Sequence, residues 1–306
     1  MIQTNVPLKD YSNYQIGGPA KYFLAVNSLK ELTDGLVEFG QKGPIFILGR
    51  ATNVLIGEKG FDGLVIYDHI KGIENKNGRV IVGAGVLISD LLKYCIQNGL
   101  SGLEWAGGLP GTVGGAVRGN AGAFSGETKD SVLEVKCVNL KTLKTIKRSN
   151  QGCNFSYRSS IFKTRAYDEM IVQVAFGLKP GDKISIENSI REKIDYRNLK
   201  HPMDLPSLGS TFKNIPVVQL SNIQREKLMQ YVKDDPFPVI PVAKLLYLCE
   251  LKGLRVGNAQ VSPKHPNFIV NLGNAKSSDV GRLIGIAKER VRQKFGVNLE
   301  EEISYL

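Results

Sequence analysis

The chain has 306 residues and a formal net charge of +11 at pH 7, with 42% hydrophobic and 23% charged residues. The length predicts two or three domains, and the composition excludes the disordered and fibrous classes of protein. No stretch approaches the roughly 18 consecutive apolar residues that cross a membrane, and residues 1–10 lack a basic segment followed by an apolar one. We therefore expect a cytoplasmic protein without a signal peptide. The positive charge leaves nucleic acid, an anionic membrane surface and a phosphate-rich ligand open as partners.

The first hundred residues predict a small α/β unit followed by further short elements. Ser28 and Glu31 form a capping box that opens a short helix. Ser89 is the expected N-cap of a second helix, whose buried face carries Leu91, Leu92, Cys95 and Ile96. Apolar patterns typical of strands cover residues 21–26, 44–49, 63–67 and 79–83.

The rest of the chain predicts a second mixed region and a separate α/β domain. The basic stretch 139–148 alternates Leu and Ile with Lys, which favours a polar hairpin at a sheet edge over a nucleic-acid-binding arm. A helix with isoleucines at four-residue spacing is expected to end near Tyr196, and the two prolines of residues 201–206 indicate a domain junction. Further expected elements are strands at 132–139, 170–178 and 267–271 and helices at 243–250 and 280–295. We therefore expect domains at 1–60, 61–200 and 201–306.

Two glycine-rich segments are the strongest local features of the sequence. Residues 48–56 read as a strand running into a tight turn, and residues 107–122 contain many closely spaced glycines. Glycines at such density let backbone N–H groups approach a pyrophosphate. Turn formation alone explains the first segment adequately, but not the second. Neither segment is a Gly-x-Gly-x-x-Gly fingerprint or a Walker loop, so a Rossmann nucleotide site is not indicated.

The cysteines and histidines indicate neither a metal site nor a disulfide framework. No Cys-x-x-Cys pair occurs, so we expect reduced and mostly buried thiols. Each histidine stands alone in sequence, which makes a metal site or a Ser-His-Asp hydrolase hard to build. These residues are Cys95, Cys137, Cys153, Cys249, His69, His201 and His265.

Seven segments in order along nearly the whole chain carry a resemblance to a known family. They are residues 14–20 (YQIGGPA), 102–117 (GLEWAGGLPGTVGGAV), 155–163 (FSYRSSIFK), 206–214 (PSLGSTFKN), 251–261 (LKGLRVGNAQV), 265–271 (HPNFIVN) and 297–303 (VNLEEEI). Together they resemble the UDP-N-acetylenolpyruvoylglucosamine reductase family, in its shorter subtype without an inserted tyrosine-bearing loop. The two glycine-rich segments resemble the paired FAD-binding loops of the vanillyl-alcohol-oxidase type flavoprotein fold.

The resemblance implies a fold and a reaction. The expected fold class is mixed α/β and α+β, with a vanillyl-alcohol-oxidase type FAD-binding fold in two subdomains, 1–60 and 61–200. A smaller α/β substrate domain, 201–306, follows, and its last residues are expected to return to the active site. NADPH reduces non-covalently bound FAD, and the flavin delivers a hydride to the enolpyruvyl ether of UDP-N-acetyl-3-O-(1-carboxyvinyl)glucosamine, which becomes UDP-N-acetylmuramate. The resemblance further implies a cytoplasmic monomer with a UDP-sugar substrate and with no metal, nucleic-acid or membrane partner.

The same resemblance assigns three catalytic residues. Arg158 clamps the substrate carboxylate, for which a planar guanidinium is suited. Ser210 donates a proton to the substrate carbanion, which requires that its own proton be replaced through hydrogen bonds. Glu302 completes the side that faces the carboxylate, either by orienting Arg158 or by donating from a protonated form.

Binding residues follow from the same motifs. Arg197 and Lys200 are expected at the UDP pyrophosphate, and the other substrate-binding candidates are Tyr157, Lys213, Asn214 and His265. The cofactor-binding candidates are Gly49, Arg50, Thr52, Asn53, Gly108, Pro110, Gly111, Thr112, Gly114, Gly115, Asn120, Ala121 and Gly122.

Several positions depart from the family pattern. Arg50, Ala51 and Thr52 replace the middle of a loop that usually reads Leu-Gly-Gly-Gly-Ser-Asn, while Asn53 is retained. Arg50 either pairs with an FAD phosphate or faces solvent. Glu301 stands where the family usually has a proline between two glutamates. Arg118, Gly119 and Ile215 are also unusual. These departures bear on FAD affinity and not on the fold.

Two other functions remain open at this point. A flavoprotein oxidase of the same fold is one, and His69, the only histidine of the predicted flavin domain, is then the candidate for tethering FAD. A basic nucleic-acid-binding protein is the other, but it leaves the glycine loops and the motif around Ser210 unexplained.

Overall fold

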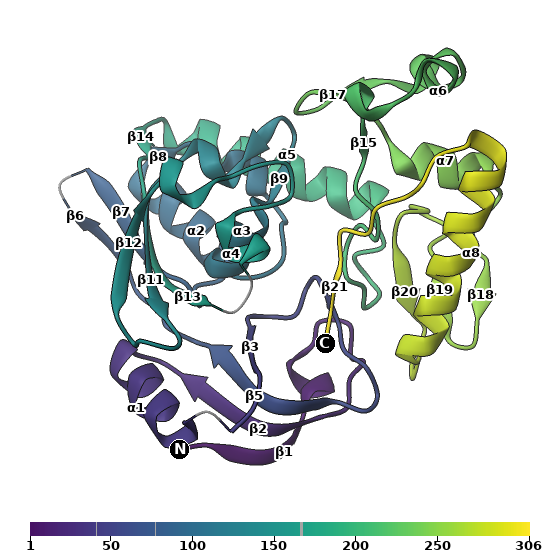
Figure 1. Cartoon of the computed structure of the whole chain (residues 1–306). Helices are drawn as coiled ribbons and strands as arrows, with labels where there is room; N and C mark the ends of the chain where they lie inside the picture. The colour runs from purple at the N-terminus through teal and green to yellow at the C-terminus, as the bar shows by residue number, and fades with distance from the viewer. Residues whose placement is uncertain (41, 77, 166–167) are drawn as a thin grey trace. The chain divides into compact units, whose positions relative to one another are not determined.

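A computed structural model describes residues 1–40, 42–76, 78–165 and 168–306 (Figure 1). Contacts between residues divide the chain into two compact units, which are described separately. Unit 1 comprises Met1–Val6, Ala20–Arg50 and Phe61–Tyr196, and unit 2 comprises Pro7–Pro19, Ala51–Gly60 and Arg197–Leu306.

The two units cut the chain at other places than the expected domains. Tyr14, Ile16 and Leu55 are buried in the hydrophobic core of unit 2, so the segments around them group with that unit. The boundary expected at residue 200 falls instead within helix α5 (Lys183–Lys200), whose last turn, from Arg197, groups with unit 2. The three-domain division stays a prediction.

Unit 1 contains a four-stranded sheet in the order β1-β2-β5-β3 (Figure 1). Strands β2, β5 and β3 run parallel, and helix α1 connects β2 to β3. Leu32, Leu36 and Phe39 of α1 share a buried cluster with Leu24 and Leu64 of the strands, as the amphipathic pattern predicts. The bounds are β1 Gln3–Pro7, β2 Pro19–Val26, α1 Leu29–Phe39, β3 Ile45–Leu48 and β5 Phe61–Asp68.

A five-stranded antiparallel sheet in the order β12-β11-β13-β7-β6 forms the rest of the unit 1 framework. Leu91 of α2 and Val117 of α3 share a buried cluster with Val82 of β7. Val138 and Met170 join the cluster of the first sheet, so the two sheets share a core. The bounds are β6 Ile73–Lys76, β7 Arg79–Gly83, α2 Ile88–Asn98, β8 Leu100–Ser101, α3 Val113–Gly119, β9 Gly122–Ala123, β10 Gly126–Glu127, β11 Val132–Asn139, β12 Thr145–Ser149, α4 Ile161–Thr164, β13 Glu169–Phe176 and β14 Lys179–Pro180.

The start of α2 differs from the prediction. Ser89 is not the N-cap, because the helix begins at Ile88 after Leu87 and has no side-chain cap. The Ile88 amide donates to the Gly111 carbonyl at 3.0 Å. A tertiary hydrogen bond therefore satisfies an amide at the helix start, where a serine cap was expected to satisfy one.

Three further predictions concern the ends and edges of single elements. The capping box at α1 is half formed: Ser28 Oγ accepts from the Glu31 amide at 3.2 Å, whereas the Glu31 carboxylate accepts from the Asn27 amide at 2.9 Å. The polar hairpin is confirmed, since β11 pairs with β12 and β12 is an edge strand. The helix expected to end near Tyr196 continues to Lys200.

Unit 2 is built from short strands and three helices. The chain's last strand, β21, pairs in parallel with β4. Two three-stranded sheets have the orders β15-β17-β16 and β18-β19-β20. The bounds are β4 Val54–Leu55, β15 Ile215–Pro216, α6 Asn222–Leu228, β16 Lys233–Asp234, β17 Pro238–Ile240, α7 Val242–Leu248, β18 Arg255–Val256, β19 Ala259–Val261, β20 Ile269–Asn271, α8 Ser277–Phe295 and β21 Ser304–Tyr305.

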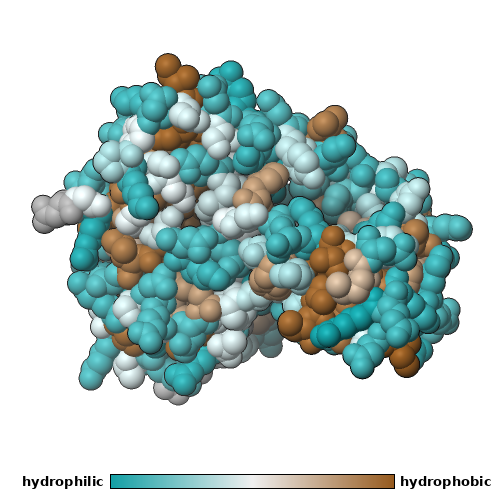
Figure 2. All heavy atoms as spheres, turned by 90° about the horizontal axis from the view of Figure 1, so that it is seen from above, coloured by the Kyte–Doolittle hydropathy of each residue, from teal (hydrophilic) through white to brown (hydrophobic). Residues whose placement is uncertain are grey.

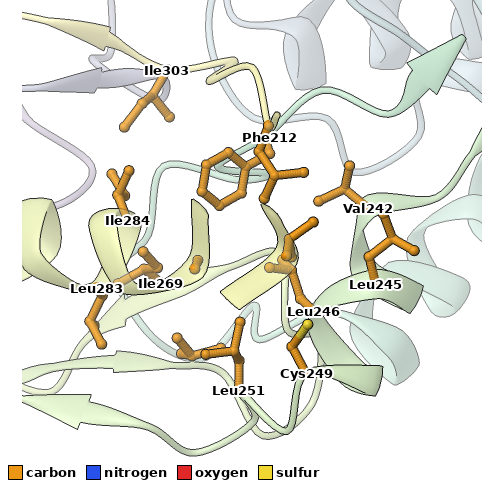
Figure 3. Close-up of a cluster of buried hydrophobic side chains, with 14 of the residues drawn as sticks. Phe212, Val242, Leu245, Leu246, Cys249, Leu251, Ile269, Leu283, Ile284 and Ile303 are labelled. Carbon is orange, nitrogen blue, oxygen red and sulfur yellow. The ribbon is translucent and has the colours of Figure 1, made fainter. Parts of the chain in front are cut away.

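The core of unit 2 packs directly beneath the motifs predicted to be functional. Figure 3 shows the ring of Phe212 between Ile284 and Ile303 on one side and Val242 and Leu246 on the other, and all five side chains are buried. Phe212 lies two residues after Ser210, and Ile303 follows Glu302. Hydrophobic packing therefore fixes the backbone next to both catalytic candidates.

The polarity of the surface and the state of the cysteines are those expected from the amino-acid composition. Hydrophilic side chains cover most of the face shown in Figure 2, and apolar side chains interrupt it in separate groups. In the described part of the chain, no helix is both long and apolar enough for a membrane span. All four cysteines are buried free thiols, as expected.

Candidate active site

A cavity of about 60 Å³ lies within unit 1 at the carboxyl end of β5. Ligands of open α/β sheets commonly bind at this end of parallel strands. Both predicted glycine loops contribute to its wall, the first at the end of β3 and the second at the start of α3. The lining residues are Ile47, Gly49, Asp68, Thr112, Gly114, Gly115, Arg118, Phe162, Glu169 and Ile171.

The two loops approach each other so closely that side chains are excluded. A Cβ atom added to Gly49 would lie 2.7 Å from Thr112 Oγ1, and one added to Gly114 would lie 3.0 Å from Ala84 Cβ. Gly111, just before Thr112, has a φ of +111°, a conformation that favours glycine. The glycines are therefore needed for close approach as well as for turning the chain.

The first amides of α3 already have protein partners. Thr112 is the N-cap, and its Oγ1 accepts from the Gly115 amide at 3.3 Å. The Gly114 amide donates to the Ala84 carbonyl at 2.8 Å. These two glycines shape the cavity wall, and their amides do not serve as the free donors that the glycine pattern predicted.

Asp68 is a buried acid on the cavity wall that the sequence analysis missed. Its side chain is 5% exposed, and its Oδ1 accepts from the Ile70 amide at 3.1 Å. Burial raises the pKa of the Asp68 carboxyl to about 7. A usable signal existed in the sequence, because this acid directly ends an apolar strand.

Glu169, on the same wall, is balanced by a partner. It accepts from Arg148 Nε at 2.8 Å and from Arg148 Nη2 at 2.5 Å, and from Cys137 Sγ at 3.0 Å. The hydrogen bonds from Arg148 hold the pKa of the Glu169 carboxyl below its usual value. Arg148, from the basic hairpin, thus neutralises one of the two acids at the cavity.

Arg158 lies beside the second glycine loop. It occupies a tight turn closed by mutual hydrogen bonds between Ser156 and Ser159 at 3.0 and 3.1 Å, and its φ is +55°. The guanidinium carbon lies 5.1 Å from the ring centroid of Tyr157. A Cβ atom on Gly122 would lie 2.8 Å from the Gly126 carbonyl oxygen and 3.2 Å from Arg158 Nη1, so glycine allows both to approach closely. A strained turn of this kind is typical of functional sites.

Asn120 joins the second loop to that turn. It is fully buried, and its Nδ2 donates to the Ser156 carbonyl at 3.0 Å and to Glu127 Oε1 at 3.2 Å. Its Oδ1 accepts from the Lys129 amide at 3.0 Å. The side chain of Asn120 therefore positions Arg158 through the backbone of the turn.

In unit 2, the motif containing Ser210 pairs with the end of the chain. The Lys213 amide donates to the Glu300 carbonyl at 2.9 Å, and the Glu302 amide donates to the Thr211 carbonyl at 2.8 Å. These bonds flank an isolated antiparallel bridge between Phe212 and Glu301. Ser210 and Glu302, which are 92 positions apart in the sequence, are thereby held on adjacent backbone segments.

Two asparagines fix this arrangement. The side chain of Asn267 donates to the Phe212 carbonyl at 2.8 Å and accepts from the Phe212 amide at 3.0 Å. Asn53 Nδ2 donates to the Glu302 carbonyl at 3.0 Å, and the Ser304 amide donates to the Asn53 carbonyl at 2.9 Å. Asn53, predicted to bind cofactor, thus holds the chain end in place.

The acidic residues before Glu302 are paired. Glu300 forms an ion pair with Lys213, and Glu301 pairs with Lys288 and accepts from the Tyr305 hydroxyl. Glu301, which replaces the usual proline, therefore ties the chain end to helix α8. The side chain of Asn214 accepts from the Val242 amide at 3.1 Å, so it supports the start of helix α7.

Arg197 and His265 belong to a partly buried basic cluster in unit 2. The rings of His201 and His265 lie 5.0 Å apart between centroids, and Arg197 is 9% exposed. Burial lowers the pKa of both histidines to about 4, and for His201 the charges of Arg197 and Lys264 lower it further. Lys200 is exposed. Sequence reasoning missed His201, because 64 residues separate the two histidines.

The three predicted catalytic residues are divided between the two units. Arg158 belongs to unit 1, while Ser210 and Glu302 belong to unit 2. His69 Nδ1 lies within hydrogen-bond distance of Asn27 Oδ1, at 3.1 Å, and in that pair the ring nitrogen is the donor. The cofactor candidates that lie on the two loops but not among the lining residues described for the cavity are Arg50, Thr52, Asn53, Gly108, Pro110, Gly111, Asn120, Ala121 and Gly122.

Two family models match the chain. The model described as UDP-N-acetylenolpyruvoylglucosamine reductase, C-terminal domain, matches residues 201–306, and the model described as FAD binding domain matches residues 20–143. A crystal structure of UDP-N-acetylenolpyruvylglucosamine reductase from Thermus caldophilus superposes with a TM-score of 0.77 at 29% identity, over 100% of this chain and 98% of that one. The predicted vanillyl-alcohol-oxidase type FAD-binding fold with a C-terminal substrate domain is confirmed.

Curated relatives extend the similarity over the whole sequence. The UDP-N-acetylenolpyruvoylglucosamine reductase of Pseudothermotoga lettingae is 37% identical over 99% of this chain and 96% of its own length. The reductase of the same name from Clostridium novyi is 34% identical over 99% of this chain and 91% of its own length. The chain therefore belongs to the UDP-N-acetylenolpyruvoylglucosamine reductase family.

Proposed function

We propose that this chain is an FAD-dependent reductase in peptidoglycan precursor synthesis. It uses NADPH to reduce the enolpyruvyl ether of UDP-N-acetyl-3-O-(1-carboxyvinyl)glucosamine to UDP-N-acetylmuramate. The observation that carries the proposal is the similarity to curated reductases over 99% of the chain. The pairing of the Thr211 carbonyl with the Glu302 amide supports it, because it sets two catalytic candidates on adjacent segments.

The residues present fit FAD. The cavity at the end of β5 has a side-chain-free approach at Gly49 and Gly114, and a buried carboxyl oxygen of Asp68 faces the Gly114 side at 3.5 Å from the position of an added Cβ. Thr112 and Arg118 supply further polar groups on the wall. These residues hold FAD, which supplies the hydride for the terminal carbon of the enolpyruvyl group after reduction by NADPH.

The protein then has to stabilise negative charge and supply a proton. Arg158 binds the substrate carboxylate, into which the charge is delocalised, because a fixed guanidinium stabilises such charge without reorganisation. Ser210 holds a proton at the carbon next to the carboxylate and donates it. Glu302 faces the same carboxylate and either orients Arg158 or shares in the proton transfer.

Substrate binding is assigned to the basic residues of unit 2. Arg197 and Lys200 bind the UDP pyrophosphate, and charge-assisted hydrogen bonds suit this role. Lys213, Asn214 and His265 border the same substrate, with Tyr157 from unit 1. The side chains of Lys213 and Asn214 already contact Glu300 and the Val242 amide, so we expect them to act chiefly by positioning the motif.

The remaining parts of the proposal concern organisation. Residues 1–60 and 61–200 form two FAD-binding subdomains, and residues 201–306 form the substrate domain. The two sheets of unit 1 do not follow the first of these boundaries, because β5 (Phe61–Asp68) belongs to the first sheet. The enzyme is a cytoplasmic monomer; its four free thiols suit a reducing compartment. Light scattering tests the monomer, and a mass of twice the chain or more overturns it.

Product analysis tests the function. Purified protein is incubated with FAD, NADPH and the enolpyruvyl UDP-sugar, with UDP-N-acetylglucosamine as the control. We expect one NADPH consumed for each molecule of a product that is two hydrogens heavier than the substrate by mass spectrometry. FAD-loaded protein that leaves the enolpyruvyl substrate unchanged would refute the proposed function.

A further inference from the structure

We propose that Asp68 binds the adenosine half of FAD, with its carboxylate accepting a hydrogen bond from a ribose hydroxyl or from the adenine amine. The inference rests on the proposed function in so far as FAD is the cofactor. Neither the sequence motifs nor the comparisons point to this residue, because it lies on a strand end outside both glycine loops.

Asp68 has a carboxylate oxygen, Oδ2, that can accept a hydrogen bond from a ligand. Asp68 Oδ1 accepts from the Ile70 amide at 3.1 Å, and in the described part of the chain Oδ2 has no hydrogen bond or ion pair. The side chain is 5% exposed and lies on the wall of the cavity. This oxygen on the cavity wall can therefore accept a hydrogen bond from a donor group of a ligand.

The carboxylate of Asp68 is chemically complementary to the hydrogen-bond donors of the adenosine half of FAD. An ionised carboxylate accepts hydrogen bonds and repels phosphate, so its partner on FAD is an O–H or N–H donor. The adenosine half carries two ribose hydroxyls and one amine. Arg118 on the same wall suits the phosphates, and Glu169 is already saturated by Arg148. Asp68 is therefore the acid on the wall that remains to accept hydrogen bonds from the hydroxyl and amine groups of the adenosine half.

The residues that line the cavity indicate which half of FAD lies beside Asp68. Every residue that lines the cavity belongs to unit 1, whereas the proposed proton donor Ser210 and Glu302 belong to unit 2. The proposed function sets the flavin ring against the substrate, whose proton donor is proposed in unit 2. Neither Arg158 nor Asn120 lines the cavity, although both lie with the second loop. The part of FAD that unit 1 encloses by itself is therefore the adenosine half.

The charged groups near Asp68 are not expected to titrate in the pH range in which Asp68 does. The wall carries Arg118 and the paired Glu169. Burial, then Lys71 and Arg50, hold the pKa of the adjacent His69 below its usual value. Burial raises the pKa of Asp68 to about 7. Of the described groups on the wall, Asp68 is thus the one expected to titrate between about pH 6 and 8.

Binding titrations on the FAD-free protein test the proposal without catalysis. Asp68→Asn keeps the acceptor for the Ile70 amide and removes the ionised oxygen. We expect FAD and ADP to bind about tenfold to a hundredfold more weakly to this variant, as for other lost charge-assisted hydrogen bonds. FMN, which lacks adenosine, should bind as to wild type. The matched control is Asp90→Asn, an exposed carboxyl of unit 1 away from the cavity, and it should change none of the three affinities.

The pH dependence gives an independent readout. If a donor of FAD bonds to the carboxylate, binding favours the ionised form, so wild-type affinity rises with pH through about 7 and binding releases protons. The Asp68→Asn variant should show neither effect. Affinity that falls as pH rises, with proton uptake, would mean that a phosphate faces Asp68 and would overturn the proposal.

The outcomes separate this inference from the proposed function. Wild-type protein that binds no FAD at all contradicts the function. Wild-type protein that binds FAD while Asp68→Asn binds FAD and ADP equally well refutes the role of Asp68 alone. Weaker FMN binding with unchanged ADP binding also refutes it, because the contact then lies on the flavin half.

Discussion

The two units hold their candidate functional residues by different means. In unit 1, Asp68 is buried at a cavity, where Oδ1 accepts from the Ile70 amide and Oδ2 has no hydrogen bond from the residues that the structure describes. In unit 2, the residues that follow Ser210 are bonded on both sides, to Asn267 and to the chain end at residues 300–302. Unit 1 keeps binding capacity at the expense of stability, whereas unit 2 keeps the rigid geometry that the proposed proton transfer from Ser210 requires.

The contrast follows from what each unit has to do. A cofactor site must retain unsatisfied groups until the ligand supplies their partners, so the apo state carries a strain that binding relieves. A proton donor must sit within a narrow range of positions, so its backbone is held by hydrogen bonds and by the buried ring of Phe212. Mutations in the two units should therefore differ in the sign of their effect on stability.

The largest effect is expected at Ser210. Ser210→Ala should slow oxidation of the reduced flavin by the enolpyruvyl substrate about 10²–10⁴-fold, the usual contribution of a general acid. FAD binding and reduction by NADPH should stay nearly unchanged, because both precede the proton transfer. Stopped-flow absorbance separates the two half-reactions. Ser210→Cys, which retains a transferable proton, should restore more activity than alanine, and a fully active alanine variant would place the proton donor elsewhere.

The next effect concerns the stability of the FAD-free protein. The folded-state pKa of Asp68, about 7, exceeds its usual value. Its contribution to stability is therefore full at low pH and is lost as pH rises through 7. Asp68→Asn should stabilise the apoprotein by up to about 4 kcal/mol at about pH 8, and the gain should shrink toward about pH 5. Urea unfolding at both pH values checks this, and a variant less stable than wild type at the higher pH contradicts it.

A change of opposite sign is expected in unit 2. Asn267→Ala removes both side-chain bonds to Phe212 and leaves a buried amide and carbonyl unsatisfied. We expect a loss of about 2–3 kcal/mol in the free energy of unfolding, as for other unsatisfied buried groups. Asn222, an exposed asparagine of the same unit, provides the matched control as Asn222→Ala. Equal losses in the two variants would show that Asn267 has no special role in fixing the motif.

The smallest effect is expected at the pyrophosphate candidates. Arg197→Ala should weaken substrate binding about tenfold to a hundredfold. Lys200→Ala should weaken it less, because exposed charges are screened by solvent and salt. Neither change should slow reduction of the flavin by NADPH. Equal damage to both half-reactions would remove these residues from the substrate site.

Regular local patterns made much of the fold predictable. The strand at 132–139 was placed at its true bounds, and the edge hairpin that follows it was predicted correctly. The N-cap of α2 was not, because the Gly111 carbonyl from another segment satisfies the Ile88 amide. The grouping of Tyr14 with unit 2 was also missed, since its burial depends on a core formed by distant residues.

The site shows the same division between local and distant information. Motifs placed Ser210 and Glu302 among the catalytic candidates, and the structure adds that their segments pair. The pairing of His201 with His265 had no local signal, because it depends on how unit 2 folds. Asp68 lies in no motif, although an acid at the end of an apolar strand is a local signal, and its burial beside a cavity depends on the fold.

The most direct test follows the flavin through both half-reactions in the wild-type protein. FAD-loaded protein is reduced with one equivalent of NADPH without oxygen, and the enolpyruvyl UDP-sugar is then added while the visible flavin absorbance is recorded. The account predicts bleaching by NADPH and a full return of the absorbance on addition of the substrate, with one product formed per flavin. Flavin that is reduced by NADPH but stays bleached with the substrate would contradict the assignment of this chain as a reductase of the enolpyruvyl group.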